Sequence, residues 1–87
     1  MTALVGDILE RVEPAYPVAA RRRGQEGEVV LIAFVADDGT VRAVEIERSS
    51  SVGLLDGAAR RALAQWRFRP GLGPKVRVSV LFRLEEN

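Results

Sequence analysis

The 87-residue chain contains no cysteine and no histidine. Without cysteine there are no disulfides, thiolate nucleophiles or cysteine-ligated metal sites, and cysteine usage says nothing about the redox compartment. Without histidine the chain lacks the usual general base near neutral pH and the commonest metal ligand. Carboxylates, one tyrosine and one lysine remain for acid–base chemistry. We therefore expect a protein that is not an enzyme and that binds no metal or cofactor.

An excess of charge is also absent, since 13 basic and 12 acidic side chains leave a formal net charge of +1. Such a balance does not match the phosphate backbone of a nucleic acid, so no nucleic-acid partner is expected. Long apolar runs that would span a bilayer are missing, and the first residues lack the pattern of a signal peptide. The length and a hydrophobic content of 47% predict one domain with one core.

The first 13 residues carry the weakest pattern in the chain. Their apolar side chains have the spacing of a short helix and are Leu4, Val5, Ile8 and Leu9. We treat residues 1–13 as an N-terminal extension or short helix, and residues 14–87 as the domain. Because a residue before proline is driven to extended geometry, Pro14 and Pro17 predict an extended segment over residues 13–16.

Pro17 is suited to open a short helix that ends at Gly24. The last turn of this helix would carry Arg21, Arg22 and Arg23, which are side chains that also attract nucleic acid or anionic lipid. The helix dipole stabilises cations at a helix C-terminus, and acidic residues lie nearby in the sequence. We therefore interpret the three arginines as a solvated helix end.

Two strands are predicted next. Residues 28–36 form an unbroken apolar run, which is typical of a central strand that is covered on both faces or paired on both edges. Asp38 and Gly39 indicate a hairpin turn into a second, edge strand over residues 40–48. The pair Asp37 and Asp38 lacks a third ligand, so turn chemistry is favoured over a metal loop. Strict alternation in the second strand would put four side chains on one face: Arg42, Val44, Ile46 and Arg48.

A helix and a last strand complete the chain. Apolar residues recur at helical spacing from Leu55 to Trp66, mostly as alanines that let the helix lie close to a sheet, and Pro70 prevents the helix from continuing. Residues 75–84 alternate with the period of a strand. The buried row of this strand is predicted to be Val76, Val78, Val80, Phe82 and Leu84.

The predicted fold class is α+β with the order short helix, β-hairpin, helix, strand (αββαβ). The hairpin strands are antiparallel, and the last strand returns to the free side of the first. This gives a three-stranded antiparallel sheet of order 2-1-3, with the helix packed on one face.

Short motifs follow one another in a fixed order along residues 14–84. They are Tyr16-Pro17, Gly27-Glu28-Val29, Asp38-Gly39, Ser49-Ser50, Leu55-Asp56, Ala58-Ala59, Trp66-Arg67-Phe68 and Pro70. In this order and spacing they resemble the C-terminal domain of TonB proteins. The resemblance implies a periplasmic domain of Gram-negative bacteria, tethered to a proton-driven inner-membrane motor by an anchor and a spacer outside this sequence. It further implies that the domain binds the N-terminal box peptide of outer-membrane transporters and energises uptake.

The last strand is the predicted site of peptide addition. With one face on the core, its outer row of N–H and C=O groups stays unpaired, so an extended peptide can add to it. In TonB proteins an extended segment before the Tyr-Pro motif also contacts the box. The predicted partner-binding residues are Glu13, Pro14, Ala15, Tyr16, Lys75, Arg77, Ser79, Leu81 and Arg83. Arg77 and Arg83 either favour an acidic or carbonyl-rich partner or protect the edge from aggregation, and the pattern leaves both interpretations open.

The same edge supports an alternative function. Related domains occur in envelope and signalling proteins, where this edge would pair with another protein or another copy. Glycines at 71 and 73 precede the last strand and would permit its exchange between copies. We therefore predict that monomer and strand-exchanged homodimer are close in free energy.

Overall fold

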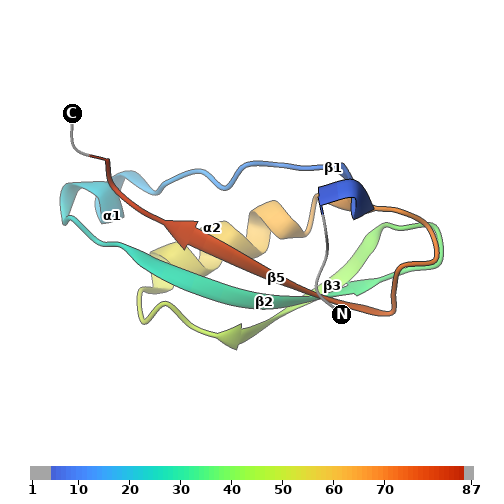
Figure 1. Cartoon of the computed structure of the whole chain (residues 1–87). Helices are drawn as coiled ribbons and strands as arrows, with labels where there is room; N and C mark the ends of the chain where they lie inside the picture. The colour runs from blue at the N-terminus through green and yellow to red at the C-terminus, as the bar shows by residue number, and fades with distance from the viewer. Residues whose placement is uncertain (1–4, 86–87) are drawn as a thin grey trace.

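The structure, a computed structural model, describes residues 5–85 (Figure 1). The elements in chain order are a 3-10 helix η1 (Val5–Asp7), β1 (Ile8–Glu10), α1 (Val18–Arg22), β2 (Gly27–Val35), β3 (Val41–Arg48), α2 (Gly53–Leu63), β4 (Arg67–Phe68) and β5 (Lys75–Phe82). Figure 1 shows α2 against one face of the large sheet, with β1 and α1 toward opposite ends of the molecule. Within the described range, no helix has the length and apolar character needed to cross a membrane.

The large sheet has the order β3-β2-β5, with both pairings antiparallel. The predictions of an α+β fold, a 2-1-3 sheet and a central apolar strand are therefore confirmed. Strand β2 is paired on both edges, but only every second side chain is fully covered. The buried row of β2 is Val29, Leu31, Ala33 and Val35, whereas in the opposite row Val30, Ile32 and Phe34 are half-buried and Glu28 is exposed.

Helix α2 covers the buried face of the sheet with small side chains. Its buried residues are Leu55, Ala58, Ala59, Ala62 and Leu63, and the alanines let the helix axis come close to the strands. The helix ends at Leu63, so Trp66 lies beyond the last turn and not within it.

Strand β3 departs from strict alternation. Its register against β2 shifts twice, and these irregularities bring Val41 onto the core side together with Val44 and Ile46. The prediction that Arg42 and Arg48 share a face with Val44 and Ile46 is wrong. Both arginines are exposed, because each added residue of a bulge moves the following side chains to the other face.

The N-terminal segment pairs with a distant part of the chain. Residues 1–13, which we treated as an N-terminal extension or short helix, contain η1 and β1 where the structure describes them, while Thr2 and Leu4 lie outside the described residues. Strand β1 is antiparallel to β4, with Ile8 opposite Phe68. Long-range pairing overrides the weak local helical pattern here. The backbone N–H of Arg69 also donates to the carbonyl of Asp7 (2.8 Å).

Candidate functional site

The last strand has one paired edge and one open edge. Strand β5 lies at the end of the sheet order and pairs with β2 alone. The N–H of Val35 donates to the carbonyl of Pro74 (2.8 Å), which marks this couple as a hydrogen-bonded pair of the antiparallel ladder. Since such pairs recur every second residue, the register directs the other backbone groups of β5 away from β2. The residues with outward N–H and C=O groups are Lys75, Arg77, Ser79 and Leu81.

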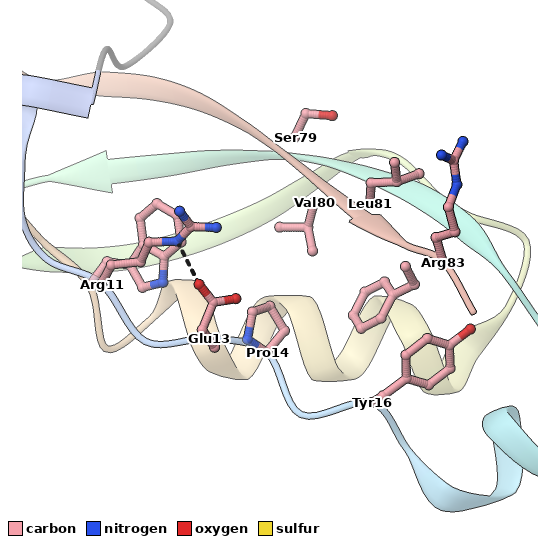
Figure 2. A pocket seen from close by; sticks show the side chains of 10 residues that line it. Arg11, Glu13, Pro14, Tyr16, Ser79, Val80, Leu81 and Arg83 are labelled. Carbon is pink, nitrogen blue, oxygen red and sulfur yellow. Dashed lines mark ion pairs between the residues drawn. The ribbon is translucent and has the colours of Figure 1, made fainter. Parts of the chain in front are cut away.

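A groove of about 380 Å³ runs along the second half of this open edge (Figure 2). Its other wall is the extended segment of residues 11–16, which we call the strap. Figure 2 shows Val80 pointing toward α2, whereas Ser79, Leu81 and Arg83 point away from it. The groove is lined by Arg11, Glu13, Pro14, Tyr16, Trp66, Ser79, Val80, Leu81, Phe82 and Arg83.

The structure brings six of the nine predicted partner-binding residues to this groove. These six are Glu13, Pro14, Tyr16, Ser79, Leu81 and Arg83. Arg83 follows the end of β5 at Phe82, so the strand predicted over residues 75–84 is two residues too long. Leu84 is outside the strand as well, and its N–H donates to a carboxylate oxygen of Glu26 (2.6 Å).

The other three predicted residues lie elsewhere. Ala15 is on the opposite side of the strap, where it lines a smaller cavity against α2. Lys75 places its ammonium 5.5 Å from the ring centroid of Phe34. Arg77 forms a two-point ion pair with Glu47, with N–O distances of 3.0 and 2.9 Å. Its guanidinium is therefore engaged by the sheet itself and is turned away from the groove.

Sequence reasoning missed several residues of the groove. Trp66, Val80 and Phe82 were interpreted as core alone, and Arg11 was not considered. The indole Nε1–H of Trp66 donates to the carbonyl of Val12 (2.8 Å), and the guanidinium carbon of Arg11 lies 5.5 Å from the indole centroid. The available signal was the N–H of the single tryptophan, because a buried indole usually finds an acceptor.

Charge in the groove is limited to a few exposed groups. Arg11 and Glu13 form an ion pair of 3.2 Å in which both side chains are more than half exposed, at 59% and 76%. The acids with a shifted pKa, Asp38 and Asp56, do not line the groove. Across residues 5–85, no cluster of three or more potential ligands is arranged to hold a metal ion. The arrangement is suited to holding an extended backbone.

Comparison with known proteins places the chain in a family. Residues 12–85 match the family described as Gram-negative bacterial TonB protein C-terminal. Protein TonB of Xanthomonas campestris pv. campestris (strain B100) is 42% identical over 77 residues, covering 82% of this chain and 34% of that protein. Protein TonB of Neisseria meningitidis serogroup C is 37% identical over 71 residues, covering 82% of this chain and 26% of that protein. The chain thus spans about a third or less of the length of these curated relatives.

A solved structure agrees with these matches. The solution NMR structure of the Pseudomonas aeruginosa TonB CTD superimposes with a TM-score of 0.76 at 29% sequence identity, covering 92% of this chain and 87% of that one. The motif order, the sheet order and the matches point to the same conclusion: the chain belongs to the TonB C-terminal domain family.

Proposed function

We propose that the domain receives an extended peptide as an added strand on the open edge of β5, and that the peptide is the N-terminal box of an outer-membrane transporter. The observation that carries this proposal is the groove between β5 and the strap. The outward backbone groups of Ser79 and Leu81 lie beside it, so a peptide in the groove would continue the ladder of the sheet.

The two edges of the sheet differ in their capacity to accept a strand. Strand β5 keeps an unbroken register with β2 over eight residue pairs. Strand β3 is interrupted by two register shifts, whereas both strands carry exposed charged side chains. Bulges on an edge oppose pairing with another strand. The edge of β5 is therefore the better template.

In this role the domain acts by binding and not by catalysis. Membership of the TonB family supports a place in the periplasm, where the domain transmits energy from an inner-membrane proton-channel motor to the transporter. The backbone ladder supplies affinity in this mechanism, and the side chains beside the groove supply selectivity.

The exposure of Leu81 favours a second candidate function. This side chain is 59% exposed at the open edge, where β5 of another copy would cover it by antiparallel pairing. The domain would then serve assembly in an envelope or signalling protein, and a strand-exchanged homodimer is a variant of the same contact. Sedimentation of the chain up to millimolar concentration tests this candidate, because a mass that stays monomeric throughout argues against it.

An NMR titration tests the peptide proposal. The probe is a synthetic peptide that spans the N-terminal box of a transporter encoded in the same genome. We expect amide shifts at Ser79 and Leu81, and we expect Leu81→Pro to abolish binding because it removes an outward N–H. Leu81→Ala is the matched control, since it keeps that N–H and should weaken binding only mildly. Shifts confined to the face of α2 around Arg60 and Arg61 would refute the proposal.

A further inference from the structure

The strap is fixed at its upstream end by Trp66. The indole Nε1–H donates to the carbonyl of Val12 (2.8 Å), although the two residues are 54 positions apart in the chain. Arg11 lies over the same ring, with its guanidinium carbon 5.5 Å from the centroid. The indole thus holds the strap through a hydrogen bond at its edge and through a cation on its face.

The strap is fixed at its downstream end by Tyr16. The phenol hydroxyl donates to the carbonyl of Gln25. The ring of Tyr16 meets Phe82 of β5 edge to face, with centroids 5.4 Å apart, and the guanidinium carbon of Arg21 lies 4.9 Å from the tyrosine centroid. This second anchor ties the strap directly to the strand that offers the open edge.

The span between the two anchors has no comparable support. The backbone of residues 13–15 forms no backbone hydrogen bond with any other residue that the structure describes, and Pro14 has no N–H to offer. The Glu13 side chain is 76% exposed. The strap is therefore a short bridge with two fixed ends, and the positions of those ends set the distance between the strap and β5.

We infer that Trp66 is a positioning residue for the added strand, because its hydrogen bond to Val12 fixes the strap that forms the wall of the groove opposite β5. This inference rests on the proposed function. The alternative is that Trp66 only fills space in the core, since it is 6% exposed and its ring centroid lies 6.0 Å from that of Phe68. The two roles separate when the indole N–H is removed and the aromatic ring is kept.

Trp66→Phe makes this separation, with the transporter box peptide as the probe. The phenyl ring still packs against Phe68 and keeps an aromatic face for Arg11, but the carbonyl of Val12 loses its donor, so the upstream anchor is weakened. We expect the affinity for the peptide to fall about fivefold, the size of effect typical of one lost hydrogen bond. The loss should lie in a faster dissociation rate, because the strap retains a peptide that is already docked.

Two readouts distinguish positioning from stability. NMR order parameters should fall at the amides of Glu13 and Ala15 in Trp66→Phe, while amide hydrogen exchange in β2 should stay unchanged, because only the strap is loosened. Thr40→Val is the matched control. It removes the hydroxyl bond to Asp38 (2.7 Å) in the β2–β3 turn, which does not line the groove, and it should leave peptide affinity unchanged.

The possible outcomes test the proposed function and the inference about Trp66 separately. A wild-type chain that does not bind the peptide overturns the proposed function, and the inference with it. A wild-type chain that binds, together with a Trp66→Phe variant of equal affinity and equal order parameters in the strap, overturns the inference alone. If Trp66→Phe does not fold, the tryptophan analogue β-(3-benzothienyl)alanine at position 66 takes its place, because it keeps the size of the indole and lacks only the N–H that bonds to Val12. An unchanged affinity for the peptide then overturns the inference.

Discussion

Gly39→Ala should be among the most damaging single-methyl changes in this domain. Gly39 lies in the turn between β2 and β3 with φ +93°, a backbone conformation that residues other than glycine rarely adopt. A Cβ built there would lie 1.9 Å from the carbonyl oxygen of Phe68. Relief of this clash requires the separation of two segments that are joined by the Phe68 N–H to Gly39 carbonyl bond (2.8 Å).

The expected decrease in the free energy of unfolding is the sum of two effects. A left-handed conformation costs an L-residue about 1 to 2 kcal/mol, and the lost backbone hydrogen bond adds about 1 kcal/mol, so we expect about 3 kcal/mol. In a domain of this size about 1 kcal/mol lowers the melting temperature by roughly 4 to 8 °C, which gives a decrease of about 12 to 24 °C. Thermal unfolding followed by circular dichroism, with urea unfolding for the free energy, measures both quantities.

Gly24→Ala is the matched control for this prediction. Gly24 also has a positive φ, +66°, but no atom lies within 4 Å of the Cβ that alanine would add. Gly24→Ala should therefore lower the free energy of unfolding only by the cost of the left-handed conformation, about 1 kcal/mol. Equal destabilisation by the two substitutions would refute the argument, because it would mean that close packing of the turn against Phe68 contributes nothing.

Three further predictions concern single side chains. Burial alone would raise the pKa of Asp56, but hydrogen bonds from Ser49 and Ser50 outweigh it and lower the pKa below 3.8, so the free energy of unfolding should decrease as pH falls through and below that value. Asp56→Asn should flatten this dependence in acid titrations followed by fluorescence, and an unchanged slope would exclude Asp56 as its source. Arg77→Ala should cost less than about 1 kcal/mol in urea unfolding, because its pair with Glu47 is half exposed, and should leave peptide affinity unchanged in calorimetry; a large loss of affinity would place Arg77 in the binding surface. Phe68→Ala should cost about 3 to 5 kcal/mol in the same unfolding assay, because this ring is fully buried, and a cost below about 1 kcal/mol would contradict its place in the core.

The parts of the fold that were predictable are those with a strong local pattern. The apolar run of β2 and the alternation of β5 identify a central and an edge strand without reference to the rest of the chain. The bulges of β3 were not predictable, because an inserted residue leaves no mark in a strand that is already mixed in polarity. Strand β1 was missed because its partner is only two residues long, Arg67–Phe68, and lies far away in the sequence.

The residues of the candidate site also fall into a part that the sequence pattern predicts and a part that it does not. The outward row of β5 follows from alternation, so Ser79 and Leu81 were identified from the sequence alone. The opposite wall depends on tertiary contacts. No local pattern indicates that Trp66 bonds to Val12, or that the Arg77 side chain is held by Glu47 of β3. Periodicity describes one strand at a time, whereas a groove is a relation between segments.

The short strand β4 also has a consequence for the order in which the domain folds. Its two residues contact both the turn, through the bridge of Thr40 with Arg67, and β1, through Ile8 opposite Phe68. The hairpin closes a short loop, but the β1 contact closes one of about 60 residues, and the entropy of loop closure delays such contacts. The N-terminal segment leaves the ribosome before the rest of the domain. Because its contact with β4 closes a long loop, it should nevertheless dock on β4 last. The strap should complete the groove only after the sheet that it faces has formed.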